Sequence, residues 1–208
     1  MKIIAHRGFW KIESEKNSMK ALSRAVENGF GFETDFRDCG GKILISHNPP
    51  KGTEIAAENV FKMYREAGCE EPLALNIKAD GLQDMMADLL KKYDITNYFL
   101  FDMSVCDTVI YVERKLQIAS RLSEFENDMP FYKDSEVVWI DYFNSDGPTI
   151  QKVKQILQDK KIACVVSPEL HKRNHTMMWQ QLLPLKDEPN LYLCTDLPDK
   201  AKDFFYGC

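Results

Sequence analysis

Short apolar runs alternate with segments of helical spacing along almost the whole chain. The first run covers residues 3–5, and apolar residues then recur three or four positions apart from Met19 to Val26, until Gly29 interrupts them. Short apolar runs predict buried strands, whereas apolar residues three or four apart predict amphipathic helices. The pattern therefore predicts a protein in which strands and helices alternate.

The elements follow from applying these two patterns along the sequence. We expect strands at residues 3–5, 30–36, 42–46, 73–78, 98–101, 117–122, 137–140, 162–166 and 191–194. We expect one helix to open at residues 17–18 and end before Gly29, and further helices at residues 55–67, 80–93, 104–114, 149–160, 174–186 and 198–206. Residues 38–41 predict a turn, and residues 124–134 a loop or short helix.

The strand count decides between two architectures. If residues 42–46 form a hairpin return, eight strands remain, with one strand and one helix in about every 26 residues. Right-handed crossovers of this kind give either an open doubly wound sheet or a closed (β/α)₈ TIM barrel. Eight units favour a compact barrel with a small hairpin after its second strand. The first strand lacks the glycine-rich loop of a dinucleotide-binding fold, and no linker interrupts residues 1–208, so we expect one domain.

Polar residues share the inner face of two predicted strands. Glu33 and Asp35 alternate with phenylalanines in the second strand, and Asn76 and Lys78 alternate with aliphatic residues in the strand at residues 73–78. Because the outer face of a barrel strand packs on helices, these polar side chains should point inward. They form either an internal salt-bridge network, for instance between Glu33 and Lys78, or a functional site at the C-terminal mouth of the barrel.

Other polar residues fall at the ends of predicted strands. They are His6, Arg7, His47, Asp102, Arg121, Asp141, Glu169, His171 and Asp196. Histidine suits both general acid and general base work near neutral pH. Two histidines at strand ends beside two carboxylates are therefore a stronger signal than any of these residues alone, although Asp141 and Asp196 are also explained as structural residues.

Charge and composition narrow the possible partners and the compartment. Lysine and arginine total 27 residues and aspartate and glutamate total 32, for a net charge of −5. This balance argues against nucleic acid as a partner but leaves room for a local phosphate site. No apolar run approaches the roughly 18 residues of a membrane span, and no secretory signal is apparent, so we expect no transmembrane segment and a cytoplasmic location.

The cysteines do not form a disulfide or zinc pattern. The six are Cys39, Cys69, Cys106, Cys164, Cys194 and Cys208. No two form a CxxC pair, and Cys164 and Cys194 lie inside apolar runs. This arrangement favours buried, reduced thiols over disulfides or zinc ligands.

Five short motifs occur in an order that resembles a known family. They are HRG at residues 6–8, EKNS at 15–18, ETD at 33–35, SHN at 46–48 and TDLP at 195–198. The sequence resembles the glycerophosphodiester phosphodiesterase family, whose pattern is HRG, PENT, ExD, HD and a closing TD-x-P, within the phosphoinositide phospholipase C-like barrel superfamily. It is also similar to a compact bacterial branch of that superfamily.

The resemblance implies roles for the motif residues. His6 and His47 would act as acid and base, while Arg7 and Lys78 would bind phosphate. Glu33 and Asp35 would bind a divalent cation, Mg²⁺ or Ca²⁺, with Mn²⁺ as a further candidate. The activity implied is that of a metal-dependent phosphoric diester hydrolase, acting on a small-molecule or lipid-head-group phosphodiester with a neighbouring hydroxyl.

The sequence departs from the family pattern at three places. Asn76 replaces a third metal-ligand glutamate, and an amide oxygen can coordinate such a cation but brings no charge. Metal binding should therefore weaken unless Asp102 or Glu124 compensates. Asn48 replaces the aspartate of the HD motif, and the family's insertion after this motif is nearly absent. These departures motivate an alternative function, a non-catalytic barrel that binds a phosphate ligand.

Three further positions have both a functional and a structural interpretation. Glu169 and His171 would contact substrate after the seventh strand; His171 and His175 could instead share a metal, or the segment could form a polar rim. Arg121 would bind a polar head group or join a surface ion-pair network with neighbouring glutamates. Trp10 would line the site or pack in the core. The sequence leaves the oligomeric state and the substrate open.

Overall fold

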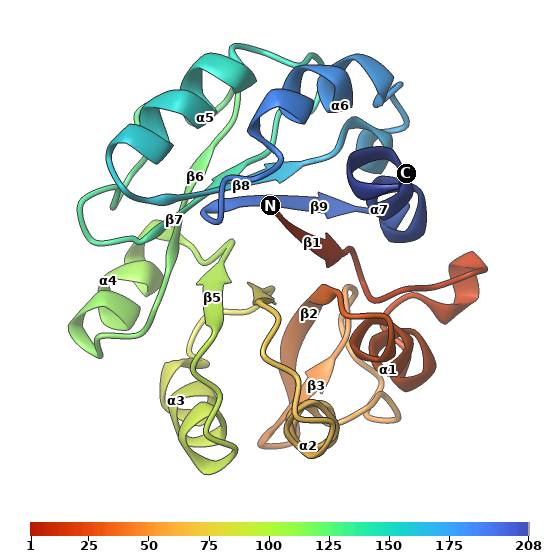
Figure 1. The fold of residues 1–208 in the computed structure, drawn as a ribbon. Coiled ribbons are helices and arrows are strands. Elements are labelled where there is room, and N and C mark those ends of the chain that lie inside the picture. The colour runs from red at the N-terminus through yellow and green to blue at the C-terminus, as the bar shows by residue number, and fades with distance from the viewer. Residues whose placement is uncertain (208) are drawn as a thin grey trace.

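The strands form a ring of parallel neighbours with helices outside it (Figure 1). The computed structural model describes residues 1–207. The order around the ring is β5 (Tyr98–Phe101), β4 (Leu73–Ile77), β2 (Gly31–Cys39), β1 (Lys2–Ala5), β9 (Leu191–Thr195), β8 (Ile162–Val166), β7 (Val137–Ile140) and β6 (Ala119–Leu122). Strands β5 and β6 meet through a parallel bridge between Leu100 and Ile118. The predicted (β/α)₈ barrel is therefore confirmed.

The ninth strand is the predicted hairpin return. Strand β3 (Lys42–Ile45) pairs antiparallel with the outer end of β2. Strand β2 continues to Cys39, so the turn is shorter than the predicted 38–41 segment and consists of Gly40 and Gly41. Both have positive φ angles, 57° and 74°, as a tight two-residue hairpin turn requires.

Helices follow the strands as the sequence pattern predicts. They are α1 (Met19–Glu27), α2 (Ala57–Glu66), α3 (Gln83–Lys92), α4 (Val105–Glu113), α5 (Thr149–Gln158), α6 (Thr176–Leu182) and α7 (Pro198–Tyr206). Three 3₁₀ turns are at Glu13–Glu15, Pro168–His171 and Leu183–Leu185. Residues 124–134 contain turns and no helix. Within residues 1–207, no helix is long and apolar enough to span a bilayer.

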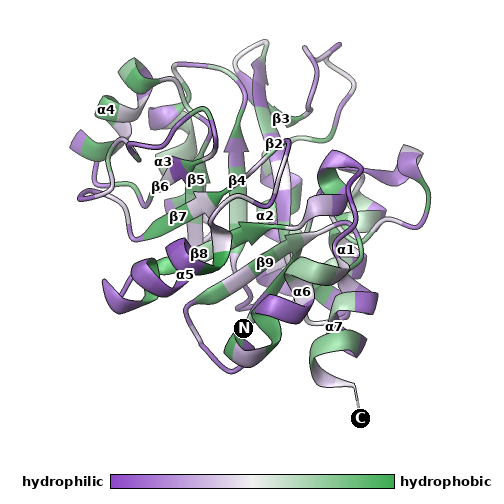
Figure 2. Cartoon of the chain, turned by 90° about the horizontal axis from the view of Figure 1, so that it is seen from above, coloured by the Kyte–Doolittle hydropathy of each residue, from purple (hydrophilic) through white to green (hydrophobic). Residues whose placement is uncertain are grey.

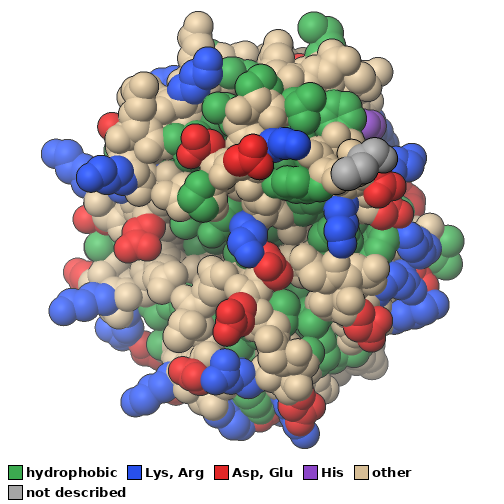
Figure 3. Space-filling view, in the orientation of Figure 1, with side chains coloured by type: hydrophobic (Ala, Val, Ile, Leu, Met, Phe, Trp, Pro, Cys, Tyr) green, Lys and Arg blue, Asp and Glu red, His purple; other side chains and the backbone are tan. Residues whose placement is uncertain are grey.

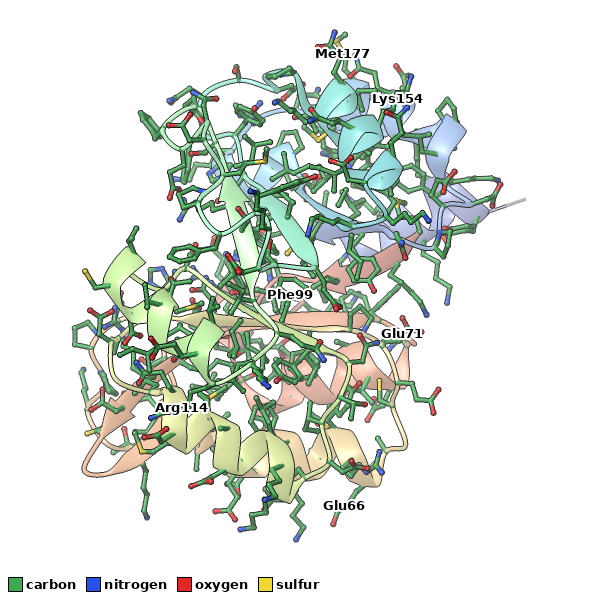
Figure 4. The ribbon with its side chains drawn as sticks, turned by 90° about the vertical axis from the view of Figure 1, so that its left-hand side faces the viewer. Glu66, Glu71, Phe99, Arg114, Lys154 and Met177 are labelled. Atoms are coloured by element: carbon green, nitrogen blue, oxygen red, sulfur yellow. The ribbon has the colours of Figure 1, made fainter. Side chains whose placement is uncertain are left out.

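The barrel has two apolar cores, one on each side of its wall. Phe32 and Leu75 belong to the outer core, together with helix residues such as Phe61. Ala74 and Phe99 belong to the core inside the barrel, and Figure 4 shows Phe99 in this interior. Figure 2 shows the hydrophobic strands at the centre and hydrophilic residues on outward turns of helices such as α5. This alternation confirms the expected inward direction of the polar strand residues.

The cysteines are only partly as predicted. Cys164 and Cys194 are buried inside the barrel, where burial raises the pKa of both thiols well above the usual value. Cys39 and Cys69 are partly exposed, and Cys106 is exposed. All five are free thiols, whereas Cys208 lies outside the described residues. The predicted burial is confirmed only for the two cysteines inside the barrel.

Candidate active site

A cavity of about 330 Å³ opens at the C-terminal ends of the barrel strands. Eight of the residues nominated from the sequence line it: His6, Arg7, Glu33, His47, Asn76, Lys78, Arg121 and His171. Trp10, Asp35 and Glu169 are not among its lining residues. The topology therefore brings most of the nominated residues together, although they come from six different strand ends.

The loop after β1 holds two of these residues through unusual backbone angles. Arg7 and Gly8 have φ angles of 56° and 82°. A Cβ atom on Gly8 would lie 2.7 Å from the carbonyl carbon of Ala21, so only glycine lets this turn lie against α1. Trp10 Nε1 donates a hydrogen bond of 3.1 Å to the carbonyl oxygen of His6. Trp10 thus braces the turn from outside the cavity.

His6 is oriented by a carboxylate. Its Nδ1 lies 2.7 Å from Oδ1 of Asp196, and its Nε2 lies 3.8 Å from Oε2 of Glu33. Burial acts to raise the pKa of Asp196, but the hydrogen bond from His6, with the charges of His6, Lys16 and Arg7, holds it below its usual value. Asp196 therefore fixes one ring nitrogen of His6 and leaves the other to face the buried carboxylate.

Three oxygen-bearing side chains gather beside His6 at the ends of two paired strands. Asp35 and Asn76 are register partners across β2 and β4, and Glu33 lies two residues before Asp35 on the same face of β2. Glu33 and Asp35 are each only 1% exposed. Asn17 Nδ2 donates to Asp35 Oδ2 at 2.7 Å. Asp35 Oδ1 and Asn76 Oδ1 are buried and have no hydrogen-bond partner among the described residues.

The buried negative charges of Glu33 and Asp35 lie close together, so positive charge nearby would stabilise them. Burial, together with the neighbouring charge of Asp35, raises the pKa of Glu33 to about 7. Lys78 Nζ lies 3.8 Å from Asp35 Oδ1, and Arg7 Nε lies 3.3 Å from Asp35 Oδ2. The salt bridge considered between Glu33 and Lys78 is not formed, because Lys78 pairs instead with Asp35 and with Asp102.

The unpartnered oxygens fit the preference of a hard divalent cation for carboxylate and carbonyl ligands. Among residues 1–207, no three histidine, cysteine, aspartate or glutamate side chains form a metal-binding group, which agrees with an amide at the third position. Asp102 accepts hydrogen bonds from Lys78 and Arg121. Glu124 accepts backbone hydrogen bonds and does not line the cavity. Neither is therefore available to replace the missing glutamate in this arrangement.

His47 lies on the rim, in the loop after β3. Its side chain is exposed, and Nδ1 lies 3.1 Å from Oδ1 of the adjacent Asn48. Its backbone oxygen accepts a hydrogen bond of 3.1 Å from Arg37 Nε. Unlike His6, it has no carboxylate partner among the described residues. His47 borders the cavity, but its ring is held less firmly than that of His6.

A chain of charged pairs occupies the other side of the cavity. Lys78 Nζ lies 3.2 Å from Asp102 Oδ2, and Arg121 Nη1 lies 2.8 Å from Asp102 Oδ1. Arg121 Nη2 is 3.7 Å from Asp141 Oδ2, while Asp141 Oδ1 is 2.6 Å from Nε2 of His171. Arg121 therefore lines the cavity and belongs to an ion-pair network, as the structural interpretation predicted, while its binding of a head group stays a prediction.

Aromatic residues form part of the cavity surface and were not nominated from the sequence. They are Phe101, Trp139 and Phe143. The Phe143 ring centroid lies 4.6 Å from that of His171 and 5.3 Å from the Arg121 guanidinium carbon. Their positions at or just after strand ends were the only sequence signal, and apolar residues there are equally typical of a core.

Asn17 is a further residue that was not nominated. It donates a hydrogen bond to Asp35 and lies within the EKNS motif.

Glu169 and His175 have structural contacts beside the cavity. Glu169 bonds to the hydroxyls of Ser167 and Thr195 and accepts a hydrogen bond of 3.2 Å from the backbone N–H of Asp196. It thereby ties the end of β8 to the end of β9. His175 lies 3.8 Å from Glu169, whereas His171 binds Asp141. In the described chain these two histidines do not share a metal-binding group.

Comparison with known proteins finds similarity in structure rather than in sequence. No family model and no curated protein matches the chain. A glycerophosphodiester phosphodiesterase from Parabacteroides distasonis superimposes with a TM-score of 0.74 and 18% identity, covering 99% of this chain and 96% of that one.

Two further solved structures share the barrel over nearly its whole length. A phosphodiesterase from Oleispira antarctica, in complex with the product sn-glycerol-3-phosphate, has a TM-score of 0.71 and 14% identity, covering 98% of this chain and 96% of that one. A Ca²⁺-dependent phosphatidylinositol-specific phospholipase C from Streptomyces antibioticus has a TM-score of 0.61 and 12% identity, covering 97% and 95%. At these identities the likeness establishes the fold.

Proposed function

We propose that this protein is a divalent-cation-dependent phosphodiester hydrolase of the glycerophosphodiester phosphodiesterase type. The observation that carries the proposal is the grouping, at the C-terminal end of the barrel, of the His6–Asp196 pair, two cationic side chains and three buried oxygen-bearing side chains, those of Glu33, Asp35 and Asn76. Barrel enzymes keep their catalytic groups at this end. The similar barrels of a glycerophosphodiester phosphodiesterase and of a Ca²⁺-dependent phospholipase C support the same reaction class.

The proposed substrate is a small-molecule or lipid-head-group phosphodiester with a hydroxyl next to the phosphate. The product bound to the Oleispira antarctica structure, sn-glycerol-3-phosphate, supports a glycerol phosphate moiety. On the face shown in Figure 3, basic and acidic side chains are interspersed. A small substrate that enters the cavity suits this mixed surface better than an extended polyanion does.

The acid–base work is assigned to His6 and His47. One histidine removes the proton of the neighbouring hydroxyl as its oxygen attacks phosphorus, and the other protonates the departing alcohol. Water then opens the cyclic phosphate while the histidines exchange roles. Asp196 keeps His6 in one orientation, so His6 is the better prepared of the two, whereas His47 has to be positioned by the bound substrate.

The charged residues around the phosphate complete the proposal. Glu33, Asp35 and Asn76 would hold Mg²⁺, Ca²⁺ or Mn²⁺, and a cation bound there supplies positive charge to the phosphoryl oxygens. Arg7 and Lys78 bind the same oxygens, the guanidinium as a planar fork and the ammonium as a point charge. These groups stabilise the negative charge that develops during attack.

The test is hydrolysis of a panel of phosphodiesters, including glycerophosphocholine, with Mg²⁺, Mn²⁺ or Ca²⁺ and with EDTA as control. The wild type should turn over at least one diester only when a cation is present. His6→Ala and His47→Ala should each lower turnover about 10²- to 10⁴-fold, which is the usual contribution of general acid–base catalysis, while circular dichroism shows an intact fold. Unchanged turnover in both variants would refute the assignment.

One observation favours a second function, a non-catalytic barrel that binds a phosphate ligand. Asn76 brings no charge to the cation site, and Lys78 lies near Asp35 in the arrangement seen here. Isothermal titration calorimetry separates the two functions. Binding of inorganic phosphate without any binding of Mg²⁺, Mn²⁺ or Ca²⁺ at millimolar concentration would favour the non-catalytic barrel.

A further inference from the structure

A second histidine–aspartate pair lies in the cavity and has no part in the proposed mechanism. His171 ends the 3₁₀ turn after β8, and Asp141 directly follows β7. His171 Nε2 lies 2.6 Å from Asp141 Oδ1, and both residues line the cavity. Asp141 is 9% exposed. Within residues 1–207, the other ring nitrogen, Nδ1, has no hydrogen-bond partner, so it is available to a ligand.

The strand order places this pair across the cavity from the phosphate-binding groups. Around the eight-stranded ring, β8 lies four positions from β4, and β7 lies four positions from β2. His171 and Asp141 therefore face the strands that carry Asn76 and the two buried carboxylates. A phosphate held by those strands would direct its remaining ester group toward His171.

The surface between the two sides suits an uncharged or aromatic alcohol. Phe143, which is partly exposed, lies against His171, while Phe101 and Trp139, 1% and 4% exposed, form the buried floor behind it with ring centroids 4.2 Å apart. The cationic groups nearby already have carboxylate partners, as Arg121 does with Asp102. An alcohol leaving group that packs on these rings would bring its ester oxygen close to the imidazole.

We propose that His171, held by Asp141, is a further catalytic residue that protonates the departing alcohol when that alcohol lies against the aromatic residues. The inference rests on the proposed phosphodiester hydrolysis. In the first step, the neighbouring hydroxyl oxygen bonds to phosphorus and its proton passes to His6. The bond from phosphorus to the departing oxygen breaks, and that oxygen takes the Nδ1 proton of a protonated His171.

The second step returns both histidines to their starting states. A water oxygen bonds to phosphorus, and one water proton passes to His171. The ester bond that closed the ring breaks, and its oxygen takes the proton held by His6. One water is consumed and one alcohol is released, so protons balance over the two steps. Asp141 acts as a positioning residue, since it keeps Nε2 of the ring occupied throughout.

Two matched substrates separate this role from a merely structural one. They are sn-glycerol 3-phosphate esterified with benzyl alcohol and the same phosphate esterified with p-nitrophenol. Both leaving groups are aromatic, but p-nitrophenolate departs without a proton and the benzyl alcohol oxygen needs one. His171→Gln should lower kcat/KM about 100-fold or more for the benzyl ester and less than about tenfold for the p-nitrophenyl ester.

The control variant is His175→Gln, which changes a nearby histidine that does not line the cavity. It should leave both rates unchanged. Hydrolysis of the p-nitrophenyl ester by His171→Gln also shows that this variant is folded. Equal losses on both esters would overturn the inference, and so would a selective loss on the benzyl ester in His47→Ala but not in His171→Gln. A wild type that cleaves neither ester with any cation would overturn the proposed function, and the inference with it.

Discussion

The two sides of the cavity satisfy their polar groups in opposite ways. On the side formed by β2 and β4, which we call the open side, Asp35 Oδ1 and Asn76 Oδ1 are buried without partners. On the side formed by β5 to β8, the closed side, the pairs Asp102–Arg121 and Asp141–His171 form within the protein, and Arg121 Nε, which faces Glu126, is the one atom of these pairs that is buried without a hydrogen bond. Both sides belong to one barrel end, but the open-side Asp35 is 1% exposed whereas the side chains of Arg121 and Asp102 are 27% and 16% exposed.

This difference indicates what each side is for. A buried polar oxygen without a partner costs free energy, and proteins keep such groups where a ligand supplies the missing interaction. A completed ion pair instead holds side chains in fixed positions before substrate arrives, which favours a defined transition-state geometry. The difference therefore supports the proposal that the open side binds cation and phosphate and that the closed side orients the departing group.

The largest expected effect comes from changing a buried carboxylate of the open side. Asp35→Asn keeps an acceptor for Asn17 but removes a charge from the cation site. We expect divalent-cation affinity to fall about 100-fold or more. Mutation of residues that only hydrogen-bond to metal ligands already lowers metal affinity about 10- to 100-fold. Turnover should fall about 100-fold or more. Calorimetry and the hydrolysis assay measure the two losses.

The matched control for this prediction is Asp38→Asn. Asp38 lies on the same strand, but its side chain is exposed and outside the cavity. This variant should bind the cation as the wild type does, and its metal-free melting temperature should stay close to that of the wild type. If Asp35→Asn retained full cation affinity, the open side would not be a cation site.

The closed side should contribute more to stability than to binding. Arg121→Met leaves Asp102 and Asp141 without their guanidinium partner. Because hydrogen bonds to charged groups contribute about 1.5–3 kcal/mol, we expect the free energy of unfolding to fall by about 2 kcal/mol. Urea unfolding followed by circular dichroism measures this change.

Arg114→Met is the comparison for this second prediction. Arg114 pairs with Asp84 on the outer surface, as Figure 4 shows for Arg114. An exposed pair of this kind contributes about 0–1 kcal/mol. Losses of the same size in both arginine variants would show that the network on the closed side is no stronger than a surface salt bridge.

The fold could be predicted from the sequence because each barrel strand is a short run of apolar residues that is visible without knowledge of its neighbours. The strands at residues 98–101, 137–140 and 162–166 agree with the structure to the residue, since runs of four or five apolar residues between polar loops have the length of a strand and are too short for a typical helix. Helix ends were predicted less well. The helix expected at residues 80–93 is α3, Gln83–Lys92, because residues 79–81 form a bend in which Gly81 has a positive φ angle of 84°.

The sequence predicted the inward direction of site residues that lie on a single strand. It did not predict contacts between residues that follow different strands. Alternation along β2 placed Glu33 and Asp35 inward, and the structure agrees. The partners of His6 and His171 could not be derived in this way, because Asp196 and Asp141 come from distant strand ends that only the closed ring brings near. Likewise, nothing local in the sequence shows that Glu169 ties two strands together beside the cavity instead of lining it.

The smallest expected effect concerns the His6–Asp196 pair. It tests whether this pair stabilises the fold through charge, as the pairs of the closed side do. Asp196→Asn should lower the free energy of unfolding by about 1 kcal/mol at neutral pH, because it removes a charge-assisted hydrogen bond. The pKa of Asp196 is held below its usual 3.8 in the folded protein, mainly by His6 acting against burial. A depressed carboxyl pKa adds stability above the unfolded pKa, and this stability is lost as the pH falls through the folded value. The difference between wild type and variant should therefore shrink as the pH falls below 3.8. Urea unfolding at a series of pH values measures it, and a difference that stays constant across that range would mean that Asp196 only packs beside His6 and does not hold it through charge.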